Sequence, residues 1–134
     1  MKYGGLPVLG ILVLTLAQSA HAQTVETGLW DRSSLDVNLD PGNIATITQD
    51  GMRNRASINQ AYAGLTTGNG NTGTVVQQGS HNSAKISQRG QNETATVEQY
   101  GSSLKAEIIQ TKDNTGIMIK QIGSGGPPAR VIQR

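Results

Sequence analysis

The stretch Asn82-Ser83-Ala84-Lys85-Ile86-Ser87-Gln88-Arg89-Gly90 decides the fold of this chain, because its pattern recurs along most of the sequence. Its alternate positions carry Asn, Ala, Ile, Gln and Gly, and the same order appears in Asn43-Ile44-Ala45-Thr46-Ile47-Thr48-Gln49-Asp50-Gly51. Residues two apart project from the same face of a β-strand. The pattern N-x-A-x-I-x-Q-x-G therefore predicts strands that bury one face.

Further, less perfect copies of the pattern begin at Asn54, Asn71, Glu93, Leu104, Thr115 and Pro127. The starts from 71 to 115 are spaced by eleven residues, so two copies make a 22-residue unit. A fixed period of this length is typical of stacked repeats. Four units are predicted, over roughly 43 to 64, 71 to 92, 93 to 114 and 115 to 134, with about six extra residues near Gly64 to Gly70 and one near Gly125.

The repeated positions predict a core built from ladders of identical side chains. Residues of the opposite parity, such as Thr46, Lys85 and Glu98, are polar and suit an outer face, and the Gly-x-x spacer between copies suits a tight turn. Stacking at about 4.8 Å would place each Ile or Val over its equivalent, and would let each Asn or Gln amide donate to and accept from the amide one rung along. The predicted amyloid-ladder residues are Asn43, Ile47, Gln49, Asn54, Ile58, Gln60, Asn71, Val75, Gln77, Asn82, Ile86, Gln88, Val97, Gln99, Ile108, Gln110, Ile119, Gln121, Val131 and Gln133.

The composition favours such a core over a conventional one. The chain has no Phe, one Trp and no Cys, so neither a large aromatic core nor disulfides can hold it together. Its many small polar residues would also suit a disordered segment, but disorder does not require a period. The predicted fold is all-β: a β-solenoid of about four stacked strand-turn-strand units, with cross-β character.

The first residues have the features of a secretory signal peptide. Lys2 is followed by an apolar run from Leu6 to Ala17 and then by Ala20-His21-Ala22, a small-residue cleavage site. The run is shorter than the roughly 20 residues that a membrane-spanning helix needs. We expect residues 1–22 to be removed, 23–42 to form a non-repeating N-terminal segment and 43–134 to form the solenoid.

The ends of the predicted stack lack the devices that keep repeat proteins monomeric. Soluble repeat proteins usually protect their last strands with polar caps, proline or bulges. Here no Pro occurs between Gly42 and Gly126, and the copy that begins at Asn43 matches the pattern as well as any internal copy. An open end of this kind invites the next subunit, so the sequence predicts fibres.

The repeats, the leader and the short non-repeating segment together resemble the curli amyloid subunits over about residues 23 to 134. Within that family, the closing residues Ala129-Arg130-Val131-Ile132-Gln133-Arg134 resemble the minor curlin more than the major fibre subunit. Glu93, Leu104 and Thr115 depart from the family pattern at the leading Asn, and Pro127 and Pro128 begin the last copy, which we expect to stack less well.

The resemblance implies a function and a location. The minor curlin nucleates polymerisation of the major curlin into extracellular fibres for adhesion and biofilm matrix. Its expected partners are the major curlin, further copies of itself, the outer-membrane curli export pore with its accessory proteins, and the outer-membrane surface, with which it associates peripherally. Export crosses the periplasm and the outer membrane, with Gln23 to Gly42 as the expected targeting stretch.

The charge distribution suggests how the chain is held at that surface. Residues 43–134 carry nine Lys and Arg against five acids, whereas residues 23–42 have a net charge of −3. We expect Arg130 and Arg134 to attach the last unit to anionic surface groups. The other cations are expected to form a solvated face, and no nucleic-acid role is expected.

Catalysis is not expected from this sequence. The expected mature chain keeps one His, His81, in a turn, so no triad or metal cluster based on His can form, and no cofactor is expected. Trp30 is interpreted as a residue that packs locally, with a partner anchor as the alternative. The Asn92-Glu93-Thr94 glycosylation match carries little weight. The alternatives that remain open are the major curlin itself and a soluble, monomeric β-solenoid adhesin.

Overall fold

A computed structural model of the chain describes residues 11–17, 34–39, 42–61 and 70–134. These residues form strands and turns and contain no helix, so none of them forms an apolar helix of membrane-spanning length. The strands are β1 Ile11–Ala17, β2 Ser34–Leu39, β3 Ile44–Met52, β4 Arg55–Ala61, β5 Thr72–Ser80, β6 Ser83–Arg89, β7 Thr94–Ser102, β8 Lys105–Gln110, β9 Gly116–Ser124 and β10 Ala129–Gln133.

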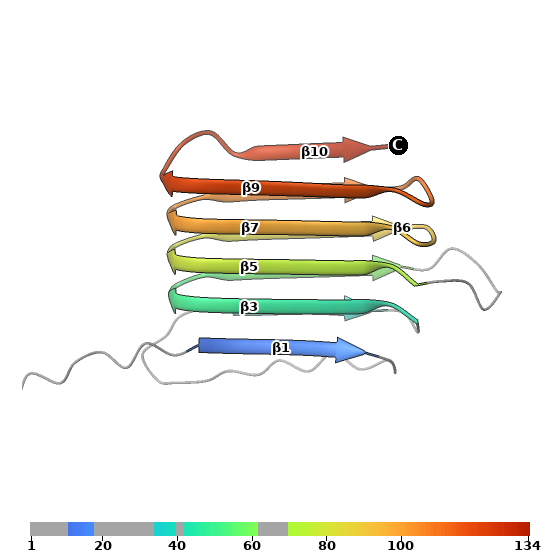
Figure 1. Cartoon of the computed structure of the whole chain (residues 1–134), viewed down its shortest axis with the longest axis horizontal. Coiled ribbons are helices and arrows are strands. Elements are labelled where there is room, and N and C mark those ends of the chain that lie inside the picture. The colour runs from blue at the N-terminus through green and yellow to red at the C-terminus, as the bar shows by residue number, and fades with distance from the viewer. Residues whose placement is uncertain (1–10, 18–33, 40–41, 62–69) are drawn as a thin grey trace, which may run out of the picture.

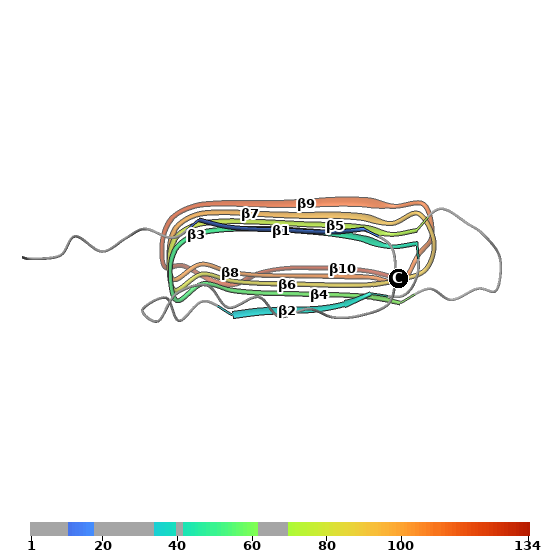
Figure 2. The same ribbon diagram turned by 90° about the horizontal axis from the view of Figure 1, so that it is seen from below.

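The strands stack into two facing sheets (Figure 1). Sheet A has the order β1-β3-β5-β7-β9, and sheet B has the order β10-β8-β6-β4-β2. From β2 onward the chain alternates between the sheets, so each pair of strands makes one flattened coil, which Figure 2 shows from below. Neighbours among β2 to β10 pair in parallel, and β1 pairs with β3 in the antiparallel direction. The predicted all-β solenoid of stacked repeats is confirmed.

The register of the strands follows the sequence period. Thr72 of β5 pairs with Thr94 of β7, an offset of 22 residues that places like residues over one another. The offset from β3 to β5 is 28 residues, six more, and the offset from β8 to β10 is 23, one more. The two insertions predicted in the Gly-rich connections therefore leave the stacking in register. Residues 62–69, which include most of the first insertion, lie outside the described residues.

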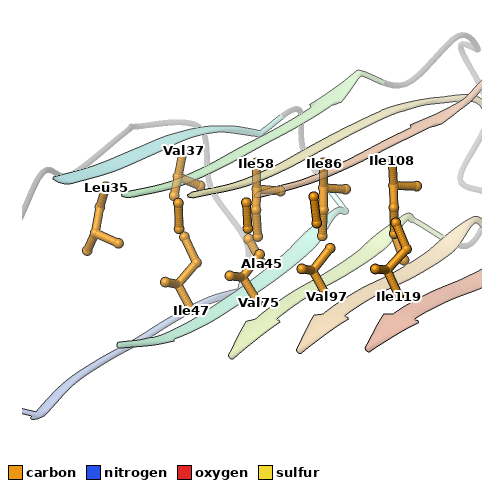
Figure 3. Close-up of a cluster of buried hydrophobic side chains, with 14 residues drawn as sticks. Leu35, Val37, Ala45, Ile47, Ile58, Val75, Ile86, Val97, Ile108 and Ile119 are labelled. Carbon is orange, nitrogen blue, oxygen red and sulfur yellow. The ribbon is translucent and has the colours of Figure 1, made fainter. Parts of the chain in front are cut away.

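The core lies between the sheets and has the alternation that the sequence predicts. In β6 the side chains of Ala84, Ile86 and Gln88 are buried, while Lys85 and Arg89 are exposed. Figure 3 shows the aliphatic seam, in which residues of sheet B face residues of sheet A: Ile58, Ile86 and Ile108 against Val75, Val97 and Ile119. Each fully buried Ile or Val contributes about 1.5 to 3 kcal/mol, so this narrow seam is the main apolar stabilisation.

The strands β3, β5, β7 and β9 of sheet A are longer than the strands of sheet B, because they continue through the repeat glycine. β5 and β7 have nine residues each. Gly79 has a φ of +112°, and a methyl group built on it would lie 1.9 Å from the carbonyl oxygen of Gly101. Only glycine permits this close approach between rungs. The following His81 is an exposed turn residue with a φ of +60°, in agreement with its predicted place.

The stack begins before Asn43, where the repeats were predicted to start. β2 lies in the segment expected to be non-repeating, yet it pairs in register with β4 and buries Leu35 and Val37 beside Ala56 and Ile58. The segment alternates apolar and polar residues, but it lacks the Asn, Gln and Gly by which the copies were recognised. β1, which falls inside the expected signal peptide, pairs with β3 on the other sheet.

Candidate functional site: the buried amide ladders and their ends

A chain of glutamine side chains runs through sheet A. The amide Nε2 of Gln49 donates to Oε1 of Gln77 at 2.7 Å, Gln77 donates to Gln99 at 2.8 Å, and Gln99 donates to Gln121 at 2.8 Å. Gln49, Gln77 and Gln99 are buried. A buried amide without a partner costs a few kcal/mol, so each rung depends on its neighbour.

Sheet B contains a second glutamine ladder, which is shorter. Gln60 donates to Gln88 at 2.6 Å, and Gln88 donates to Gln110 at 3.0 Å. Gln110 then donates to Thr115 instead of to Gln133, although Gln133 lies beside it in register. Oε1 of Gln133 is buried without a partner, so the last copy completes the backbone pairing but leaves its side-chain link unmade. This break agrees with the poorer stacking expected of the copy that Pro127 begins.

Both ladders have a direction. Every link between two glutamines of these ladders runs from an Nε2 in an earlier rung to an Oε1 in a later rung. The N-terminal ends therefore carry acceptors, and Oε1 of Gln49 and Oε1 of Gln60 are buried without a partner in the described chain. At the opposite end of the stack, the sheet A ladder closes with the amide group of Gln121. The sheet B ladder closes at Gln110, and the amide group of Gln133 lies beyond it in register without joining it. The two ends of the stack are thus chemically different.

The leading asparagines are buried as predicted, but they do not bond to one another through their amides. Oδ1 of Asn71 accepts the backbone N–H of Glu93 at 3.0 Å, one rung along, and Nδ2 of Asn71 donates to the carbonyl of Gly90 at 3.0 Å. Asn43, Asn54 and Asn82 follow the same scheme. The short Asn side chain reaches the backbone at the turns, whereas the longer Gln side chain reaches its equivalent.

One ladder position holds a buried acid. Glu93 occupies the place of the leading Asn, is fully buried, and has two carboxylate oxygens without a hydrogen-bond partner among the described residues. A methyl group on Gly90 would lie 2.9 Å from Oε1 of Glu93 and 2.5 Å from Oδ1 of Asp113, so the two carboxylates flank the same glycine. Burial raises the pKa of Glu93 from 4.5 to about 7, and the charge of Asp113 adds to the rise. The departure at Glu93 was visible in the sequence, but its burial beside Asp113 was not.

The remaining predicted residues lie where the chain leaves the core. The ladder residues from Asn43 to Gln110, and Ile119, are buried, whereas Gln121, Val131 and Gln133 are half-buried at the end of the stack. Arg130 and Arg134 are exposed, and Nε of Arg130 pairs with Oε2 of Glu107 at 2.8 Å. Among the described residues no group of three or more His, Cys, Asp or Glu could hold a metal ion.

Replacing an internal ladder residue should destabilise the stack, and Gln77→Met tests this. The variant leaves Nε2 of Gln49 without an acceptor and Oε1 of Gln99 without a donor. We expect the free energy of unfolding to fall by about 2 to 4 kcal/mol. The matched control is Gln78→Met on the exposed face, which should cost about 0.5 kcal/mol or less. Equal losses in denaturant titrations of the two variants would contradict the ladder.

The raised pKa of Glu93 predicts a pH-dependent stability. Below pH 4.5 its carboxyl is protonated in both the folded and the unfolded chain, and this contribution to stability is fully present. As the pH rises through about 7 it is lost, because only the unfolded chain ionises without cost. We expect the unfolding midpoint of the wild type to fall over this range.

Glu93→Gln should flatten that decline, since a neutral amide has no charge to bury. Glu98→Gln is the control, because Glu98 lies on the outer side of the adjoining strand β7, where it pairs with Lys120 at 3.1 Å. Thermal or denaturant unfolding at a series of pH values gives the measurement. A slope that Glu93→Gln leaves unchanged would assign the pH dependence to other groups.

Comparison with known proteins connects this geometry to a family. A family model of the curlin-associated repeat matches residues 67–90 and 82–111, which include the rungs from β5 to β8. No curated protein and no solved structure matches the chain. The matched residues include the links from Gln77 to Gln99 and from Gln88 to Gln110, and the match supports a place for this chain in the curlin family.

Proposed function

We propose that the chain is the minor curlin of its producer, a subunit that nucleates polymerisation of the major curlin into extracellular amyloid fibres for adhesion and biofilm matrix. The curlin repeat suggests a curli subunit, and the curlin family implies self-assembly into extracellular fibres. The observation that carries the proposal is the direction of the glutamine ladders. Each ladder begins with a buried acceptor, on Gln49 or Gln60, that has no donor among the described residues. The sheet A ladder runs from there to the amide group of Gln121, which belongs to the opposite end of the stack.

The backbone at the C-terminal end supports growth in the same way. β9 pairs with β7 along one edge and β10 pairs with β8, and in the described structure their other edges have no strand beside them. β9 offers nine residues of unpaired edge. An unprotected edge of this length is a template for a further strand, and in-register Gln and Ile side chains favour a strand of the same repeat.

The proposal includes a route and a location. Residues 1–22 act as the signal peptide and are removed, residues 23–42 direct the chain to the outer-membrane curli pore and its accessory proteins, and residues 43–134 supply the repeats that template. Removal of residues 1–22 would take β1 away and bare the edge of β3. The chain would then act at the cell surface with the major curlin, further copies of itself and the outer membrane as its partners.

Nucleation predicts that a trace of the mature chain shortens the lag of the major curlin's polymerisation. Thioflavin fluorescence of the major curlin, with and without the trace, measures this lag. A variant that carries both Gln77→Met and Gln99→Met is the control, because it interrupts one ladder without changing charge. We expect the variant to shorten the lag less than the wild type.

The alternatives give different results in that experiment. A major fibre subunit would polymerise alone into fluorescent fibres but would not shorten the partner's lag when present as a trace. A soluble adhesin would neither polymerise nor seed. Either outcome would replace the nucleator proposal.

Surface attachment is the second part of the proposal, and it assigns Arg130 and Arg134 to anionic surface groups. Both are exposed at the end of the stack. Glu107 accepts ion pairs from both Lys85, at 3.3 Å, and Arg130, at 2.8 Å, so it offsets part of the charge of Arg130. No ion pair is found for Arg134 in the part of the chain that the structure describes, which makes it the freer of the two charges.

Replacing Arg130 and Arg134 together by Gln should release the protein from cells into the medium, because the last unit then loses two positive charges. The control replaces Lys85 and Arg89 by Gln, which removes the same charge from the exposed face of an internal strand, β6. Immunodetection in the cell and medium fractions measures retention. Equal retention of the two variants would remove this role.

A further inference from the structure

The two sheets do not contain the same number of strands once β1 is set aside. Sheet B contains five strands, with β2 at one end and β10 at the other, whereas sheet A then contains four, from β3 to β9. The chain alternates between the sheets, so both of its terminal strands belong to sheet B. This inequality matters wherever one copy is stacked on another.

Head-to-tail stacking brings the two terminal strands into the same place. If β9 of one copy pairs with β3 of the next, sheet B has room for only one strand between β8 of the first copy and β4 of the second. β10 of the first copy follows β9 into that place, and β2 of the second copy precedes β3 in it. One place cannot hold two strands, so one of them must leave.

The ladder in sheet B favours β10 over β2. Register places Leu39 of β2 beside Gln60 of β4, and leucine has no amide to offer. Oε1 of Gln60 is buried and has no hydrogen-bond partner in the part of the chain that the structure describes. β10 has Gln133 at the equivalent register, as its pairing with Gln110 of β8 shows. A copy of β10 beside β4 would give Gln60 the donor that β2 cannot supply.

The rest of β10 fits the same surface. Its inner residues Ala129, Val131 and Gln133 pair with Ala106, Ile108 and Gln110 of β8. The inner residues of β4 are Ala56, Ile58 and Gln60, the same order of small, branched and amide side chains. Donation from Gln121 to Gln49 across the same joint would satisfy the other buried acceptor, on sheet A.

We infer that β2 is a displaceable plug: strand Ser34–Leu39 covers the edge of β4 in the free chain and yields that edge to β10 of a second copy. The inference rests on the proposed self-assembly and names the surface by which it proceeds. The plug holds its place by pairing six residues with β4 and burying Leu35 and Val37, while it leaves the ladder acceptor unpaired. β2 therefore covers the acceptor end of the stack, although Gln60 has no amide donor among the described residues.

The alternative joint keeps both strands and fits less well. β10 would then pair with β2 of the next copy, and sheet A would lack a strand between β9 and β3. That joint leaves the nine-residue edges of β9 and β3 unpaired and both buried acceptors unsatisfied. Displacement of β2 costs the six-residue pairing of β2 with β4. In return, β9 pairs with β3 and β10 pairs with β4, and both buried glutamine acceptors gain an amide donor.

A disulfide that locks β2 onto β4 tests the plug. Asp36 and Ser57 are register partners with exposed or half-buried side chains, and adjacent strands about 4.8 Å apart are within the reach of a disulfide. The mature chain that carries Asp36→Cys and Ser57→Cys is prepared in its oxidised and in its reduced form. Each form is added to fibres of the wild-type mature chain, and elongation is followed by thioflavin fluorescence. The native chain has no Cys, so no other bridge can form.

The control keeps Ser57→Cys and moves the second cysteine to Lys85, the register partner of Ser57 on β6. This bridge lies inside the stack and leaves β2 free. We expect the oxidised 36–57 variant to lose elongation and to regain it on reduction, whereas the 57–85 variant elongates in both states. A locked copy can still add to a fibre through its own β9 and β10, but its locked β2 then prevents the next copy from adding. Small amounts of the oxidised 36–57 variant should therefore also stop elongation by the wild type.

Elongation of the oxidised 36–57 variant at the rate of the oxidised 57–85 variant would overturn the plug. If neither the wild type nor the control elongates, self-assembly itself is refuted, and the inference fails with it. Hydrogen exchange gives a second reading: the amides of β2 should be protected in the monomer and unprotected in fibres. Protection of β2 retained in fibres would overturn the inference whatever the kinetics.

Discussion

The structure depends on one constraint: a glutamine amide buried between two sheets needs a partner one rung away. Gln77 meets it by accepting from Gln49 and donating to Gln99, and it can do so only if all three rungs are in register. The same register stacks Val75 and Val97 in the seam and brings the carbonyl of Gly101 against Gly79. Hydrogen bonding therefore sets the alignment, and the small apolar seam and the close glycine contacts follow from it.

Each rung supplies the hydrogen-bond partner that its neighbour needs, so the rungs at the two ends of the stack each lack one partner. Gln49 and Gln60 show this directly, because each keeps a buried acceptor with no donor. A globular protein pairs nearly all of its buried polar groups, and soluble repeat proteins cover the ends of the stack with polar caps. Here β2 covers one ladder end, and its register pairs Leu39 with Gln60, whose Oε1 has no hydrogen-bond partner among the described residues. The proposed self-assembly thus arises from the feature that stabilises each rung.

The rungs differ in how well they fit, and the differences lie at particular positions. Glu93 introduces an ionisable group where the other rungs of sheet A have asparagine or threonine, and its proximity to Asp113 makes that rung sensitive to pH. Gln110 turns to Thr115 instead of bonding to Gln133, which weakens the last rung. The irregular positions therefore lie both inside the stack, at Glu93, and at its C-terminal end, where Gln110 meets Thr115.

The sequence by itself determined the strands, their buried face, their number per unit and the effect of both insertions, because these depend on local alternation and on a period that parallel stacking must preserve. Only the tertiary structure decided which group each amide meets. Asn71 bonds to backbone groups, whereas Gln77 bonds to the equivalent Gln99 side chain as well as to the carbonyl of Arg55. The side chain of Gln is longer by one methylene, and it lies farther from a turn. The strand character of Ser34–Leu39 likewise depended on the edge that β4 offers, and the burial of Glu93 beside Asp113 on a contact between residues one coil apart. Such contacts join separate coils, and no local pattern specifies them.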